Sequence, residues 1–233
     1  MSTSAPKLPP ATVPTEGLTR TFAASLLALL LSLVLVLVAT NQGQAFTTEA
    51  LRRSEVARAP QPIPDFAMLN GAGQPTTLHQ LLASDERIWV VDFVYTRCET
   101  ICTVLGAVYQ QLQQQVEARG LQGQVGLLSV SFDPANDDAP ALQAYAARME
   151  MNPAVWDIVS LVAVSDRRRL LAAFGIMVVP APLGEFEHNA ALLIVNARGQ
   201  LLRILDYDST HQVLDVALAV GATIKLARSD GNP

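Results

Sequence analysis

An apolar run near the amino terminus constrains this chain more than any other feature. Residues 22–39 are apolar or small throughout, apart from Ser25 and Ser32. As a helix, this run would extend about 27 Å, close to the ~30 Å thickness of a bilayer's hydrocarbon core. A cleaved leader usually has a shorter apolar region followed by a small-residue cleavage site, and no good site follows here. We therefore expect an uncleaved transmembrane anchor over residues 21–40, with a cleaved leader as the alternative.

The segments on either side of the apolar run are polar. Residues 1–20 contain four prolines and few apolar side chains, which is typical of a disordered tail. Arg20 is the charge nearest to the span, so the positive-inside rule favours a cytoplasmic tail and a main domain on the periplasmic or extracytoplasmic side. Residues 41–61 form a polar linker, and the globular domain occupies residues 62–228.

Strand-like and helix-like segments alternate along this domain. Short β-branched runs bounded by turn residues predict strands, and apolar residues at 3.6-residue spacing predict helices. Such alternation predicts an α/β fold with a mixed sheet covered by helices on both faces. The expected strands are 65–69, 76–78, 88–95, 125–132, 190–195 and 201–206, and the expected helices are 100–118, 139–149, 167–174 and 210–227.

Charge and cysteine content exclude several classes of protein. The formal net charge of −5 gives no indication of a nucleic-acid-binding surface. The chain has two cysteines in all, Cys98 and Cys102, so it lacks the disulfide framework of small secreted domains. A bridge between residues this close would constrain the unfolded chain little. The pair therefore indicates redox chemistry or metal binding, against the plainer alternative of two buried, inert cysteines.

Cys98 follows the predicted strand 88–95, and Cys102 lies in the first turn of the next helix. The unpaired N–H groups and positive partial charge of a helix amino end stabilise a thiolate. A spacing of four residues places both sulfurs on one face of the helix, with Cβ atoms about 5–6 Å apart. Such a pair can form a disulfide after a small adjustment, or bind one soft metal ion.

A third ligand would separate these two possibilities, and the chain has three histidines. We interpret His79 and His211 as exposed surface residues. His188 follows an irregular loop over residues 179–187 and comes directly before a predicted strand, which is where a loop can approach the cysteine-bearing helix. Two thiolates and one imidazole suit Cu(I) and also tolerate Cu(II).

Three ordered motifs resemble those of a known family. The segment 91–98, Val-Asp-Phe-Val-Tyr-Thr-Arg-Cys, with a second cysteine four residues later, is similar to the signature of the Sco (SenC) copper chaperones. Residues 130–134, Val-Ser-Phe-Asp-Pro, followed by Asp137, resemble a second motif of that family. Residues 187–190, Glu-His-Asn-Ala, resemble its late histidine motif. The likeness extends over residues 62–227.

The resemblance implies a thioredoxin-like fold with an N-terminal transmembrane helix. It also implies copper bound by Cys98, Cys102 and His188. The family delivers copper to the dinuclear copper site of cytochrome c oxidase subunit II, so the expected partner is that apoprotein or another copper acceptor. Glu99 and Thr103 replace the prolines that usually follow the motif cysteines, and Glu187 replaces a common aspartate.

A thiol–disulfide oxidoreductase is the alternative function. Cys98 would attack a partner disulfide and Cys102 would resolve the mixed disulfide. Asp92, in an apolar strand six residues before Cys98, could accept a proton in that reaction, or it could simply pair with a polar neighbour. We expect the acidic pair Asp137 and Asp138 to favour the start of the helix 139–149, and residues 167–169, all arginine, to be a solvated helix face.

Overall fold

The computed structural model describes four stretches of the chain, and these fall into two compact units. The described stretches are residues 15–39, 48–97, 101–182 and 186–229. The first unit is Met1–Ser54 and the second is Glu55–Pro233. Each unit is described by itself.

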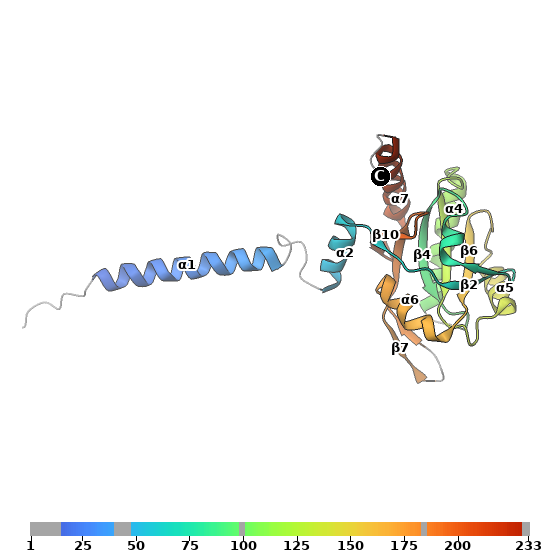
Figure 1. The fold of residues 1–233 in the computed structure, drawn as a ribbon, viewed down its shortest axis with the longest axis horizontal. Helices are drawn as coiled ribbons and strands as arrows, with labels where there is room; N and C mark the ends of the chain where they lie inside the picture. Colours follow the sequence, from blue (N-terminus) through green and yellow to red (C-terminus); the bar gives the residue numbers. More distant parts are fainter. Residues whose placement is uncertain (1–14, 40–47, 98–100, 183–185, 230–233) are drawn as a thin grey trace, which may run out of the picture. The chain divides into compact units, whose positions relative to one another are not determined.

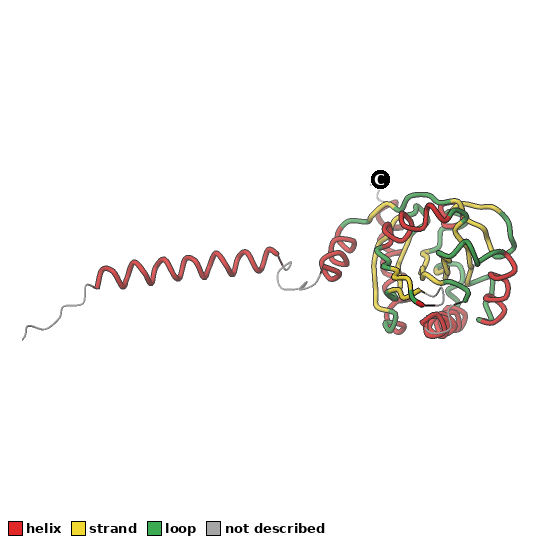
Figure 2. Tube along the Cα trace, turned by 90° about the horizontal axis from the view of Figure 1, so that it is seen from below, coloured by secondary structure: helices red, strands yellow, loops and turns green. Residues whose placement is uncertain are grey.

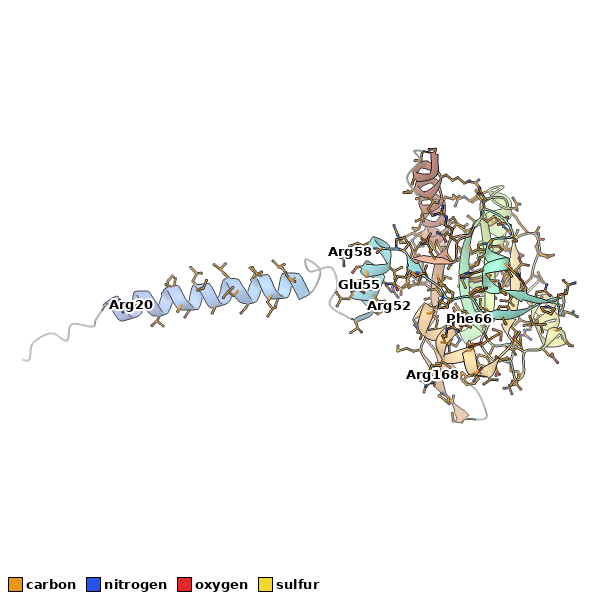
Figure 3. All side chains as sticks on the ribbon, in the orientation of Figure 1. Arg20, Arg52, Glu55, Arg58, Phe66 and Arg168 are labelled. Atoms are coloured by element: carbon orange, nitrogen blue, oxygen red, sulfur yellow. The ribbon has the colours of Figure 1, made fainter. Side chains whose placement is uncertain are left out.

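The first unit is dominated by helix α1, Thr15–Ala39, which runs without a break (Figure 1). Its stretch Arg20–Val38 has a mean hydropathy of 2.7 and no buried residues, so it is long and apolar enough to cross a membrane. Figure 3 shows its side chains projecting on all sides, with Arg20 near its amino-terminal end. The Ser32 hydroxyl donates to the Ala28 carbonyl at 2.8 Å, so this polar group is satisfied within the helix.

Helix α2, Thr48–Arg58, lies in the region that composition predicts as a polar linker. Glu49 accepts from both Arg52 and Arg53 at 3.1 Å, which are the one-turn contacts that support a polar helix. Val56 is fully buried and belongs to the core of the second unit. Leu51 and Val56, its two large apolar residues, lie five positions apart and give no helical period, which explains why the sequence did not predict this helix.

An eight-stranded sheet forms the centre of the second unit. Its order is β1-β10-β9-β4-β5-β6-β2-β3, with β4, β5 and β6 parallel and the remaining neighbours antiparallel. All side chains of the central strands β4 and β5 are buried, as their β-branched runs predict. The strands are β1 Gln61–Pro62, β2 Ala67–Asn70, β3 Pro75–Thr77, β4 Ile88–Val94, β5 Val125–Ser131, β6 Trp156–Leu161, β9 Ala191–Val195 and β10 Gln200–Asp206.

Helices cover both faces of this sheet, as predicted (Figure 2). Tyr109 of α4 packs on Trp156 of β6, with ring centroids 5.2 Å apart. On the other face, Phe174 of α6 packs on Phe93 of β4 at 4.9 Å. The helices are α3 Leu78–Leu82, α4 Ile101–Ala118, α5 Ala139–Arg148, the short 3₁₀ turn η1 Val164–Asp166, α6 Arg167–Phe174 and α7 Thr210–Ser229.

A second, two-stranded sheet replaces the irregular loop expected before His188. Strand β7, Val178–Pro180, pairs antiparallel with β8, Phe186–His188, and His188 lies opposite Val178. Strands of three residues containing a proline leave no period-two pattern to read. Strand β6 was also missed, because Asp157 and Ser160 interrupt its apolar run.

Candidate functional site

The carboxyl ends of β4 and β5 form the edge of the sheet where the predicted site lies. The two strands are parallel and in register, with Val94 beside Ser131, so the segments that follow them emerge together. Thr96 and Arg97 lead from β4 toward the cysteine pair. Cys98 lies outside the described residues, and Cys102 is the second residue of α4. Cys102 therefore occupies a helix amino end, as predicted.

Asp137 fixes the segment that enters the cysteine pair. Its carboxylate accepts from the Thr96 amide at 3.1 and 3.2 Å and from the Thr96 hydroxyl at 2.6 Å. The Ser131 hydroxyl donates to the same carboxylate. Burial raises the pKa of Asp137, and these hydrogen bonds oppose the rise. Because the residue is 1% exposed, each of these donors would be costly to leave unpaired.

This role corrects the expectation that both Asp137 and Asp138 serve the helix that follows. Asp138 does so: it is the N-cap of α5, and its side chain accepts from the Ala141 amide at 3.0 Å. Asp137 instead bonds to Thr96, which is 41 positions earlier in the chain. The sequence does contain a signal for this role, because Asp137 follows the motif at residues 130–134. Rules for local helix capping do not use that signal and assign an acid at this position to the helix start.

Asp133 organises the charges around the same segment. Arg97 donates to its carboxylate at 3.3 Å and Arg167 at 2.9 Å, while the Asp133 side chain is 3% exposed. Arg167 is therefore part of a partly buried ion pair, which corrects the prediction of a solvated face at this residue. Arg168 and Arg169 are exposed, as predicted. Arg148 donates to the Thr96 carbonyl at 3.1 Å and completes the attachment of the entry segment.

His188 reaches this edge from the β7–β8 hairpin. Its ring packs against Phe132, which directly follows β5, with centroids 5.5 Å apart, and against Tyr95 at 6.4 Å. Its Nδ1 lies 3.1 Å from the Asn189 carbonyl oxygen. A carbonyl oxygen only accepts, so Nδ1 carries the hydrogen and the neutral ring has its lone pair on Nε2. This is the tautomer in which Nε2 can bind a metal ion.

The other two histidines lie elsewhere. His79 is partly buried, and its Nε2 lies 2.8 Å from the Ile63 carbonyl oxygen, so it joins α3 to the segment after β1. The interpretation of His79 as an exposed surface residue is therefore wrong. His211 is exposed at the start of α7, as predicted. Neither residue takes part in the aromatic contacts of His188.

Asp92 is the buried acid of strand β4. It is 0% exposed, and among the described residues neither of its carboxyl oxygens accepts a well-formed hydrogen bond. Burial raises its pKa to about 7, and the nearby Ser129 hydroxyl only partly offsets this effect. Tyr109 of α4 lies close enough for the Asp92 charge to raise the pKa of its phenol further. Asp92 thus faces the cysteine-bearing helix and titrates near neutral pH.

Of the predicted ligands, Cys102 lies in the first turn of α4 and His188 ends β8. Among residues 15–39, 48–97, 101–182 and 186–229, no three His, Cys, Asp or Glu side chains gather as a metal site. Cys98 is outside these ranges. In donor chemistry, two thiolates and the Nε2 of His188 fit a soft monovalent copper ion.

Sequence comparison places the chain among known proteins. The family model for SCO1/SenC matches residues 55–220. The chain belongs to the SCO1/SenC family. A curated relative, the SCO1 protein homolog of Bacillus subtilis (strain 168), is 28% identical over 148 residues, covering 63% of this chain and 73% of that protein. This confirms the resemblance noted in the three motifs.

Solved structures of Sco proteins share the fold. BsSco, a member of the Sco family of cytochrome c oxidase assembly proteins in which a disulfide switch was identified, is 26% identical with a TM-score of 0.56, covering 69% of this chain and 95% of that one. Arabidopsis thaliana ScoI with copper bound is 14% identical with a TM-score of 0.56, covering 67% and 97%. These matches confirm the thioredoxin-like mixed sheet flanked by helices.

Proposed function

We propose that this Sco-family chain is a membrane-anchored copper metallochaperone. It holds Cu(I) between the thiolates of Cys98 and Cys102 and the Nε2 of His188. It passes that ion by ligand exchange to the dinuclear copper site of cytochrome c oxidase subunit II. Copper is the cargo here, and the chain acts by binding and transfer. The copper-bound ScoI structures of Arabidopsis thaliana and Bradyrhizobium japonicum support a copper role by family likeness.

One observation carries this proposal: the position and tautomer of His188. Its ring packs on Tyr95 and Phe132, the residues that follow β4 and β5, and so lies at the edge where the chain enters Cys98. The Nδ1 contact to the Asn189 carbonyl assigns the ring hydrogen to Nδ1, so Nε2 is the nitrogen with the donor chemistry for a metal ion.

A Cu(I) competition titration under anaerobic conditions tests the ligand set. We expect wild type to bind one Cu(I) per chain and His188→Ala to bind it at least tenfold more weakly, because one of three ligands is lost. His211→Ala is the matched control, since that imidazole is exposed on α7, and it should bind like wild type. Equal affinity of wild type and His188→Ala would contradict the proposed site.

The anchor and the side of the membrane belong to the same proposal. We place a cytoplasmic tail at residues 1–20, the span at 21–40, a linker at 41–61 and the Sco domain at 62–228 on the periplasmic side. The apolar helix α1 and Arg20, the charge nearest to the span, support this orientation. Delivery to the acceptor is tested by mixing copper-loaded protein with the apo soluble domain of subunit II. Copper should leave the donor and appear in the acceptor.

Thiol–disulfide reduction is the second candidate, favoured by the disulfide switch identified in BsSco and by buried Asp92. The Cys98 thiolate attacks a partner disulfide, breaks its S–S bond, releases one partner thiolate and forms a mixed disulfide with the other partner sulfur. The Cys102 thiolate then displaces the partner thiolate, so the partner gains two electrons and this chain ends as a Cys98–Cys102 disulfide. If the reduced protein reduces the oxidised acceptor no faster than free dithiothreitol does, this function is excluded.

A further inference from the structure

The strand that carries His188 stands apart from the main sheet. Among the described residues, β7 and β8 pair only with each other. A hairpin with strands of three residues is not stable by itself, so contacts with the body of the domain must hold it. Asn189 supplies one attachment at the carboxyl end of β8, since its side chain accepts from the Met177 amide at 2.7 Å and donates to the Gly175 carbonyl at 3.3 Å.

Tyr95 supplies the attachment at the amino end of β8. Its hydroxyl donates to the Phe186 carbonyl at 3.1 Å and accepts from the Phe186 amide at 3.2 Å. The Asn189 amide donates to the Met177 carbonyl at 3.3 Å, so hydrogen-bonded pairs alternate along the hairpin and Phe186, opposite Pro180, turns its amide and carbonyl away from β7. The phenol thus satisfies backbone groups that β7 leaves open. Tyr95 is 1% exposed, so these bonds are shielded from water.

The same contact links the two parts of the proposed site. Tyr95 directly follows β4, three residues before Cys98, whereas Phe186 lies two residues before His188. The rings of Tyr95, Phe132 and Phe186 also pack edge to face or tilted, with centroids 5.4 to 5.6 Å apart. A shift of β8 away from Tyr95 would therefore carry the imidazole away from the edge where the cysteine segment begins.

We propose that the Tyr95 hydroxyl is a positioning group for His188, holding β8 against the end of β4 so that the imidazole is preorganised for copper. This inference rests on the proposed function. Tyr95 itself contributes no copper ligand. By holding β8, it restricts the motion of the His188 side chain in the apo protein, so less conformational entropy is lost when copper binds.

The first test needs no metal. Tyr95→Phe removes only the hydroxyl and keeps the ring packing. The matched control, Tyr109→Phe, removes another buried hydroxyl that bonds to a backbone carbonyl, that of Val90 at 3.0 Å. In hydrogen exchange of the apo protein, Tyr95→Phe should speed exchange of β8 amides about thirtyfold and leave β9 unchanged, because both hydrogen bonds that hold Phe186 are lost. If β8 exchanges no faster than in the control, the attachment is not what holds the hairpin.

The second test asks whether the effect passes through His188. Copper loss to an excess of chelator is measured for wild type, Tyr95→Phe, His188→Ala and the double variant. Copper should leave Tyr95→Phe about tenfold faster than wild type, and Tyr95→Phe should add nothing in the His188→Ala background. An equal acceleration in both backgrounds would overturn the proposal, since Tyr95 would then act on the cysteines. If His188→Ala loses copper at the wild-type rate, the proposed function is wrong. The hydrogen-exchange result then still decides whether Tyr95 holds β8.

Discussion

At the scale of single residues, Asp92 is the most unusual group in the core. Its carboxyl group is fully buried and accepts no well-formed hydrogen bond from the part of the chain that the structure describes, so it favours the neutral form. Its folded-state pKa of about 7 lies above the unfolded value near 3.8. The unfolded chain therefore releases this proton first as pH rises. The contribution of Asp92 to stability is unperturbed below about pH 4 and becomes increasingly unfavourable up to about pH 7.

We predict that Asp92→Asn changes the pH dependence of folding. Between pH 5 and pH 8, the free energy of unfolding of the variant should rise relative to wild type by roughly 2–3 kcal/mol, because the neutral amide has no charge to bury. Urea unfolding of the second unit at the two pH values measures this difference. Asp208→Asn, at an exposed position, is the control and should show no such change. If the free energies of unfolding of wild type and Asp92→Asn differ by the same amount at both pH values, the raised pKa of Asp92 is contradicted.

At the scale of secondary-structure elements, the turn between β5 and α5 contains two adjacent acids with different structural roles. Asp138 begins α5, whereas Asp137 binds the Thr96 segment that leads to the cysteines. The long apolar strands and amphipathic helices could be predicted because their signals are local and repeated. The role of Asp137 could not, because Thr96 comes close only after β4 and β5 have paired. The β7–β8 hairpin and the Tyr95 contact escaped prediction for the same reason.

Substitution of the two neighbouring acids should separate these jobs. Asp138→Ala removes one helix cap and should cost about 1 kcal/mol. Asp137→Ala leaves three donors of Thr96 and Ser131 without their acceptor in a buried place, and should cost about 2–4 kcal/mol. Chemical denaturation of both variants gives the two values. The account of this turn is wrong if the two substitutions are equally costly, or if Asp138→Ala costs more.

At the scale of the whole molecule, the chain joins an apolar helix to a domain whose candidate site is at one edge of its sheet. The anchor could be inferred from the sequence because a membrane span requires an apolar run of a certain length. The cysteine pair could be inferred because a disulfide or a shared metal ion requires a close spacing of the two residues. The position of His188 relative to the cysteines depends on a hairpin that sequence periodicity does not reveal. The candidate ligands were therefore identifiable from sequence, whereas the contacts that hold His188 were not.

The proposed anchor predicts how the chain partitions between the membrane and soluble fractions. Full-length protein should stay with membranes through an alkaline carbonate wash, because burying the apolar stretch Arg20–Val38 is strongly favourable. Protein lacking residues 1–47 should appear in the soluble fraction. Protease added to intact spheroplasts should digest the Sco domain while a cytoplasmic marker survives. A domain protected until the cells are lysed would place it on the cytoplasmic side, against the proposal.

The central claim is that one imidazole and two thiolates meet at the carboxyl edge of β4 and β5. X-ray absorption at the copper edge of the Cu(I)-loaded protein measures this first shell directly. We predict two sulfur ligands and one nitrogen ligand for wild type, and loss of the nitrogen in His188→Ala with the sulfurs retained. A shell of sulfur alone in the wild-type protein, unchanged by His188→Ala, would contradict the account.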